Sequence, residues 1–210
     1  GILYGRLGKR SKAVEYQQKA YETAGKFSVR ESTTTYASNL GMAYFDNGEP
    51  QKALEVLLQS LNLAGETDFL GKSRALNNIG QIYEKLGDAS RAVGYYEQAL
   101  PLSQKVGERR FEAVSLNNLG KANLELGQYE KAREHFEKAL EIARATKNKR
   151  HEAAFLGNLA QTYFALGDRS KAAEFFNDSL SINQKLGDRL GEAAILRKVG
   201  QTGLAAGETA

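Results

Sequence analysis

The chain has 210 residues, of which 41% are hydrophobic and 26% are charged, a composition that is ordinary for a folded globular protein. No apolar run approaches the ~20 residues that a membrane-spanning helix needs, and the absence of cysteine excludes disulfides and thiolate metal sites. The net charge of +4 is mild and the basic clusters are short, so neither nucleic acid nor a membrane is expected as a partner.

The beginning of the chain resembles the middle of a repeat unit. It has no initiator methionine, so we expect the chain to be a piece of a longer protein. The order of charged and apolar residues typical of a secretory signal peptide is missing, and we therefore expect a cytoplasmic location. Residues 1–8 are expected to end a truncated first helix, and residues 11–26 to form its partner, so that residues 1–26 make a partial repeat.

Four full helix hairpins are expected to follow, and then a final helix without a partner. Within a hairpin, apolar residues recur at the spacings of one helix face, as Leu76, Ile79 and Tyr83 do. A glycine turn such as Leu86-Gly87-Asp88 separates the two helices. The second helix is expected to open on a polar residue or proline, at Ser11, Pro50, Ser90 and Ser170. The hairpins are expected at residues 30–66, 70–106, 110–147 and 150–186, and the final helix at residues 189–206.

The hairpins repeat one pattern of small and large residues. A glycine or alanine in the first helix recurs at intervals of 39 or 40 residues, at Gly41, Gly80, Gly120, Ala160 and Gly200. An alanine and then a large apolar residue recur in the second helix, at Ala53 and Leu57, Ala92 and Tyr96, Ala132 and Phe136, and Ala172 and Phe176. A period of this length indicates a solenoid of stacked repeats, in which small residues let helices approach and large ones fill the space between them.

This pattern resembles the tetratricopeptide repeat, in the longer-repeat subclass found in spindle-orientation adaptors, kinesin light chains and bacterial multidomain regulators. The resemblance covers essentially the whole chain and implies an all-α fold, a right-handed superhelical solenoid of antiparallel helix hairpins across residues 1–210. HEAT and armadillo repeats have comparable periods, but their helix pairs do not require glycine or alanine at these positions. The chain departs from the pattern locally, for example where Ala160 replaces the glycine and Asn123 replaces a tyrosine.

An asparagine recurs two residues before the glycine or alanine, at Asn39, Asn78, Asn118 and Asn158. This offset turns the side chain by about 200° around the helix axis, away from the partner helix. We call the face that it occupies the first-helix stripe. The stripe comprises Thr35, Asn39, Met42 and Asp46; Arg74, Asn78, Gln81 and Lys85; Val114, Asn118, Lys121 and Glu125; Ala154, Asn158, Gln161 and Ala165; and Ala194, Lys198, Gln201 and Ala205.

The resemblance implies that the stripe faces a concave groove and that the four asparagines grip a bound peptide. An amide carries donors and an acceptor together, which matches the backbone of an extended peptide. The alternative is that each asparagine forms a hydrogen bond to an adjacent hairpin.

Other polar residues of the stripe are expected to add specificity. Positive charges on and beside the stripe outnumber the two negative ones, Asp46 and Glu125, and therefore favour an acidic peptide. The alternative is that these are solvated surface charges with little effect. The additional peptide-binding candidates are Arg74, Gln81, Lys121, Gln161 and Lys198.

Nothing in the sequence indicates catalysis. The two histidines, His135 and His151, have no partner at metal-ligand spacing, and no nucleophile lies beside a base. We therefore expect a non-enzymatic protein without a cofactor or metal. Three functions stay open: a scaffold that binds an extended, acidic peptide, a regulatory array that packs on another domain of the same polypeptide, and a module that self-associates end to end through its terminal repeats.

Overall fold

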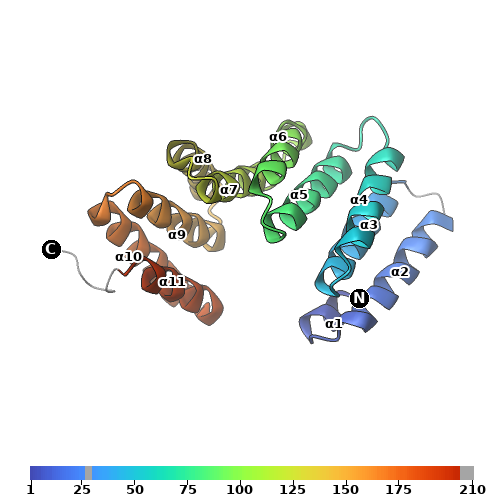
Figure 1. The fold of residues 1–210 in the computed structure, drawn as a ribbon, viewed down its shortest axis with the longest axis horizontal. Coiled ribbons are helices and arrows are strands. Elements are labelled where there is room, and N and C mark those ends of the chain that lie inside the picture. Colours follow the sequence, from blue (N-terminus) through green and yellow to red (C-terminus); the bar gives the residue numbers. More distant parts are fainter. Residues whose placement is uncertain (27–29, 204–210) are drawn as a thin grey trace. The chain divides into compact units, whose positions relative to one another are not determined.

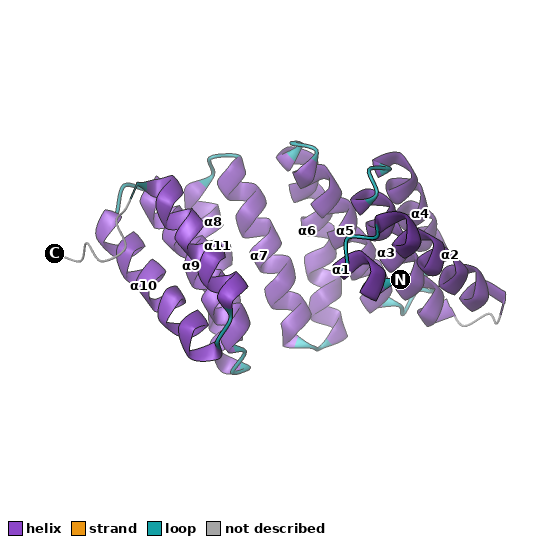
Figure 2. Cartoon of the chain, turned by 90° about the horizontal axis from the view of Figure 1, so that it is seen from below, coloured by secondary structure: helices purple, strands orange, loops and turns teal. Residues whose placement is uncertain are grey.

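The computed structural model describes residues 1–26 and 30–203, and these residues form helices joined by short turns, with no strand among them (Figure 2). The expected final helix at 189–206 therefore ends partly outside the described residues. The chain divides into two compact units, residues 1–107 and 108–210. Each unit is a stack of helix hairpins, coloured from blue to green and from olive to red in Figure 1.

The helices of the first unit alternate between first and second helices of successive hairpins. Helix α3 packs on α2, α4 and α5, and α5 packs on α6. First helices thus contact one another as well as their own partners. The bounds are α1 (Ile2–Arg6), α2 (Arg10–Lys26), α3 (Arg30–Asp46), α4 (Pro50–Leu63), α5 (Phe69–Lys85) and α6 (Ala89–Val106).

The second unit repeats this arrangement. Helix α9 packs on α8 and α10 and also contacts the first helices on either side of it, α7 and α11. Helix α11 has no second helix of its own among the described residues, and Leu190 and Leu196 on it are exposed. The bounds are α7 (Arg109–Glu125), α8 (Tyr129–Ala145), α9 (Lys149–Ala165), α10 (Arg169–Leu186) and α11 (Arg189–Thr202).

The core of each hairpin follows the small and large residues of the repeat. The large residues of the second helices, Leu57, Tyr96, Phe136 and Phe176, are fully buried, as are the alanines four residues before them. Each of the first three lies against the glycine of its partner helix, where a Cβ atom would overlap it. A Cβ atom on Gly80, for example, would lie 2.5 Å from the Tyr96 ring. The glycines are therefore required by close packing of the hairpin.

The turns explain why the hairpins end where they do. Gly87 takes a positive φ of 81°, and the following Asp88 donates its backbone N–H to the carbonyl of Tyr83 at 2.9 Å. The Asp88 carboxylate then accepts the N–H of Arg91 and caps α6. Asp168 caps α10 in the same way. The helices thus begin before Ser90 and Ser170, so the expectation that these serines open them is wrong by one or two residues, whereas Pro50 does begin α4.

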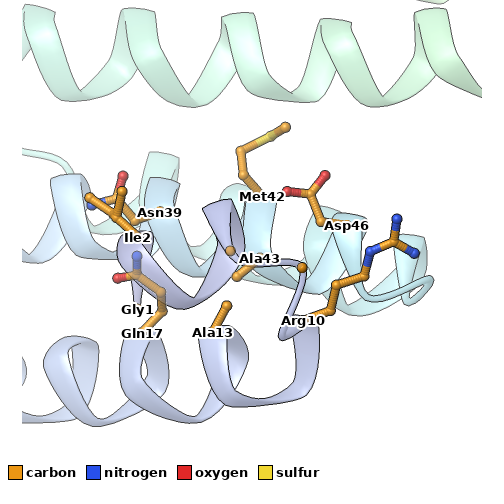
Figure 3. Close-up of a pocket in the computed structure, with 11 residues that line it drawn as sticks. Gly1, Ile2, Arg10, Ala13, Gln17, Asn39, Met42, Ala43 and Asp46 are labelled. Carbon is orange, nitrogen blue, oxygen red and sulfur yellow. The ribbon is translucent and has the colours of Figure 1, made fainter.

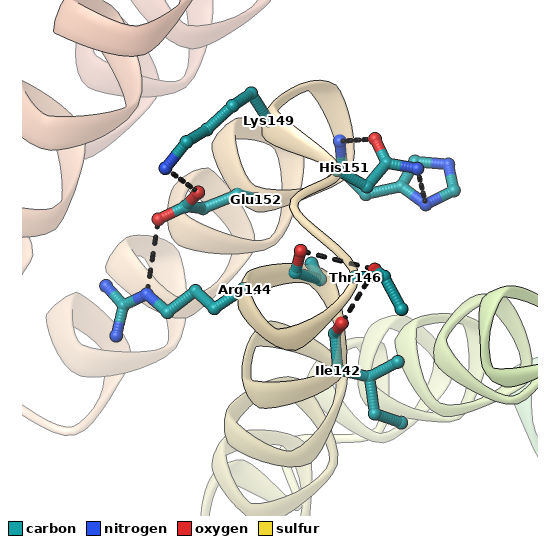
Figure 4. Close-up of polar contacts among 8 residues, drawn as sticks. Ile142, Arg144, Thr146, Lys149, His151 and Glu152 are labelled. Carbon is teal, nitrogen blue, oxygen red and sulfur yellow. Dashed lines mark hydrogen bonds and ion pairs between the residues drawn. The ribbon is translucent and has the colours of Figure 1, made fainter.

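A buried carboxylate, that of Glu152, lies at the α8–α9 turn and pairs with two cations. Glu152 is 8% exposed, and it accepts hydrogen bonds from the Arg144 side chain at 3.2 Å and from Lys149 at 2.7 Å. The two cations approach the carboxylate from different sides (Figure 4). Burial, the largest single influence, raises the pKa of Glu152, but Lys149 and Arg144 together outweigh burial and lower the pKa below its usual value.

We expect Glu152→Gln to lower the free energy of unfolding by about 1 kcal/mol at pH ~7, because it removes two charge-assisted hydrogen bonds. The contribution of a carboxylate with a lowered pKa is present above its unfolded pKa and is lost as the pH falls through the folded pKa. The stabilities of the parent and the variant should therefore converge as the pH falls through the lowered pKa of Glu152, as measured by urea unfolding at a series of acidic pH values. Glu192, forty residues later, is the matched control, because its contact with Arg189 is longer, at 3.5 Å. Equal losses for Glu152→Gln and Glu192→Gln would contradict this account.

Candidate peptide-binding site

The first-helix stripe of the first unit borders a cavity. Asn39 and Met42 of α3 line this cavity of about 570 Å³ together with residues of α1 and α2, among them Ile2 and Gln17 (Figure 3). Asn39 is half-buried, and its amide makes no hydrogen bond to another described residue. Its donors and acceptor therefore remain available to a ligand.

The next asparagine of the stripe is partly used within the protein. The Asn78 amide on α5 donates to the backbone carbonyl of Ser38 on α3, at 3.4 Å. This hydrogen bond links two successive first helices, and no described residue donates to the side-chain oxygen of Asn78. Gln81 and Arg74 on the same helix are both half-buried.

The asparagines of the second unit are more deeply placed. Asn118 is 5% exposed and Asn158 is 8% exposed. The Asn158 amide donates to the side-chain oxygen of Asn117 at 2.6 Å, and its own oxygen accepts a hydrogen bond from the ammonium of Lys198. Asn158 on α9 therefore joins α7 to α11 through side-chain contacts.

These contacts correspond to the alternative raised for the asparagines. Asn78 and Asn158 form hydrogen bonds to adjacent hairpins, whereas Asn39 does not. Asn117, an amide that recurs only as Asn77 and is therefore a weaker candidate for peptide binding, is a direct partner of Asn158. Its position one residue before Asn118 places it on the side of α7 that faces α9, and only the packing of those helices reveals it.

Lys198, which contacts Asn158, lies near two other cations of the second unit. We call Lys121 of α7 and Arg197 and Lys198 of α11 the cation cluster. Burial, followed by the positive charges of Lys121 and Arg197, lowers the pKa of Lys198 from 10.5 to about 8. Lys198 is half-buried, and neither it nor Arg197 forms an ion pair with any described residue. The half-buried Gln161 lies one helical turn beyond Asn158, and the exposed Glu125 lies one turn beyond Lys121.

The described residues contain no group of three or more histidine or acidic side chains that could hold a metal ion. His151 contacts Asn148 and the ring of Phe155, and burial, followed by the charge of Arg110, lowers its pKa. Within the same residues, every helix is too short or too polar to cross a bilayer.

The sequence profile of the tetratricopeptide repeat matches residues 31–105 and 111–185, which together make up most of the chain. The chain belongs to the tetratricopeptide repeat family. The resemblance to this family, and the all-helical repeat fold expected from it, are thereby confirmed. Arrays of this family typically serve as non-enzymatic scaffolds for protein–protein interaction, and their extended surfaces are suited to that role.

Two curated relatives match part of the tetratricopeptide array. Outer dynein arm-docking complex subunit 4 of Danio rerio is 39% identical over 67 residues, which are 31% of this chain and 14% of that protein. The heat shock protein sti1 homolog of Schizosaccharomyces pombe is 29% identical over 90 residues, 42% of this chain and 14% of that protein. The matched segments thus span about one-seventh of the length of these relatives.

A solved structure shares the same repeat fold. The Q17M form of a Podosopora anserina protein of kinesin light chain type, with nearly identical TPR-like repeats, superposes with a TM-score of 0.70. The alignment covers 89% of this chain and 92% of that chain at 24% identity. This likeness shows that the tetratricopeptide fold extends over nearly the whole of both chains.

Proposed function

We propose that this tetratricopeptide array is a protein-interaction scaffold that binds an extended, acidic peptide along the first-helix stripe. The observation that carries the proposal is the cation cluster of the second unit. Lys198 is a half-buried ammonium beside two other cations, and no described carboxylate neutralises it. An acidic side chain of a ligand is a suitable partner for such a group.

The position of the cluster supports binding at the stripe rather than on the outer surface. Burial of a charge is costly unless a partner compensates it. Half of the lysines of this unit avoid that cost because they lie exposed on second helices, as Lys131 and Lys138 do on α8. Lys198 instead lies among the first helices, where its ammonium donates to the Asn158 oxygen. We infer that Asn158 holds the ammonium in place and that the ammonium contacts the ligand.

The remaining asparagines have different parts in this proposal. Asn39 has a free amide beside the cavity of the first unit, so it is the asparagine best suited to contact the backbone of a peptide directly. Asn78 retains only its oxygen for a backbone N–H. Asn118 and Asn158 are buried, and Asn158 contacts the side chains of Asn117 and Lys198. Gln81 and Gln161 provide further amides on the two units.

We expect the double variant Lys121→Gln/Lys198→Gln to bind a fluorescent, glutamate-rich peptide at least ~10-fold more weakly than the parent at ~0.1 M salt. Removing two cations takes away the charges that the carboxylates contact. Fluorescence anisotropy measures this loss, and a glutamine-rich peptide of the same length tests the charge requirement.

The matched control is Lys131→Gln/Lys138→Gln, which makes the same change of charge on the exposed face of α8. It should bind nearly as well as the parent, because distant surface charges are screened by salt. If both double variants lose affinity equally, the attraction is a property of net charge and the proposed site is wrong. If the parent binds no acidic peptide, the surface instead favours packing on another domain of the same polypeptide.

A further inference from the structure

We propose that the cation cluster recognises a phosphorylated serine or threonine in a segment that is otherwise neutral, an inference that rests on the proposed peptide-binding function. The charge of the second-unit stripe is concentrated at one place. Lys198 contacts Asn158, and Lys121 and Arg197 lie close enough to Lys198 to lower its pKa, whereas Glu125 is the only other charged residue of the stripe in this unit. The neutral positions include Val114, Ala154, Ala165 and Ala194.

Concentrated charge favours a single compact anion. Successive residues of an extended peptide are about 3.3 Å apart, so the carboxylates of an acidic segment are spread along the chain. Such a segment would be matched by cations spaced along the stripe. The exposed or half-buried alanines and the valine found there instead suit small, uncharged ligand residues. The charge pattern therefore indicates one strongly charged group flanked by neutral ones.

The balance of charge favours a phosphate over a carboxylate. The three cations and Glu125, the one carboxylate of this stripe, carry a net charge of +2. A phosphorylated side chain carries about −1.5 to −2 near neutral pH and has three acceptor oxygens. It neutralises this charge almost completely, whereas a single carboxylate would leave about half of it. Arg197 and Lys198, which are close enough for the charge of Arg197 to lower the pKa of Lys198, offer several N–H donors to such oxygens.

The order of burial also fits a phosphate. Lys198 is half-buried and is held by Asn158, so its ammonium is already oriented before a ligand arrives. Arg197 is exposed and can adjust to a bulky tetrahedral anion, and its guanidinium is suited to bidentate contact with two phosphate oxygens. Lys198, which is held in place, and Arg197, which can adjust, are thus suited to bind one dianion together.

The test uses the whole chain and a short, alanine-rich, acetylated and amidated peptide labelled with fluorescein. Four versions carry phosphoserine, serine, glutamate or two adjacent glutamates at the centre. We expect the phosphoserine peptide to bind at least ~10-fold more tightly than the glutamate peptide, because a dianion gains more from the clustered cations. Lys198→Gln should remove most of this preference, and Lys138→Gln on α8 should preserve it. Circular dichroism melting of each variant establishes that it is folded.

The possible results separate this inference from the proposed function. If the diglutamate peptide binds as tightly as the phosphoserine peptide, the phosphate inference is wrong and the acidic-peptide proposal stands. If Lys198→Gln is folded but keeps the full preference, the cation cluster is not the phosphate site. If no version binds better than the serine peptide, both proposals are overturned. Competition by inorganic phosphate alone at the same concentration as the phosphopeptide would show that the flanking residues add nothing, and would also contradict recognition of a segment.

Discussion

Gly120→Ala is expected to lower the free energy of unfolding by about 1–3 kcal/mol, although alanine is the better helix former. A Cβ atom at residue 120 would lie 2.6 Å from the ring of Phe136, which is fully buried between α7 and α8. The ring is surrounded by close-packed atoms and cannot move without displacing them. The steric cost should therefore exceed the gain in helix propensity.

The matched control is Gly200→Ala, the equivalent substitution in α11. Among the described residues, no heavy atom outside the neighbouring helix backbone lies within 4 Å of a Cβ atom there, so this variant should gain up to ~1 kcal/mol from helix propensity alone. Urea unfolding followed by circular dichroism measures both changes. If both variants are stabilised alike, the close approach of the α7–α8 hairpin does not require glycine. Ala160, which occupies the same position opposite Phe176, shows that a hairpin with different spacing can accept the methyl group.

Lys198→Met is expected to raise the free energy of unfolding by about 1–3 kcal/mol near pH 7, because the pKa of Lys198 is lower in the folded chain than in the unfolded one. Burial, together with the charges of Lys121 and Arg197, lowers the pKa of Lys198 from 10.5 to about 8 in the folded chain. Folding therefore disfavours the ammonium, while methionine has a similar length and no charge. A substitution that stabilises the protein and weakens peptide binding would identify Lys198 as a residue kept for function at the expense of stability.

The pH dependence of stability provides a second measurement on the same variant. Between pH 8 and 10.5 the unfolded chain holds the Lys198 proton more tightly than the folded chain does. The contribution of Lys198 to stability must therefore rise with pH across this window. Lys198→Met should lack that rise, and Lys138→Met, on the exposed face of α8, should retain it. If Lys198→Met is less stable than the parent at pH 7, the buried ammonium of Lys198 does not lower the free energy of unfolding, and this account is wrong.

The fold could be predicted from the sequence because the residues that each helix–helix contact requires recur in several repeat units. The spacing of Gly80 and Tyr96, repeated at Gly120 and Phe136, describes one contact between two helices, and the structure contains it. Helix openings were harder to predict, since Ser90 and the earlier Asp88 are both good capping residues. Only the turn at Gly87 decides between them.

The candidate site was less predictable because it depends on distances between hairpins. Helical periodicity gives the direction of Asn158 about its own helix, but it does not give how closely α7 and α11 each approach α9. That closeness buries Asn158 and brings Asn117 and Lys198 to its amide. The same argument explains why Asn39 and Asn158, equivalent in sequence, differ in the structure: the amide of Asn39 borders a cavity instead of a neighbouring lysine.

The hydrogen bond between Asn158 and Lys198 has a consequence that depends on the amide being neutral. An aspartate at residue 158 would attract the ammonium more strongly and would form an ion pair with it, so the net charge of the pair would be zero and the lysine would be neutralised inside the protein. The amide oxygen orients the ammonium but leaves its full positive charge in place. Asparagine thus orients the ammonium without competing with an incoming anion. Its replacement by aspartate, which spontaneous deamidation produces, would prevent the lysine from binding an anion even if the lysine kept its position.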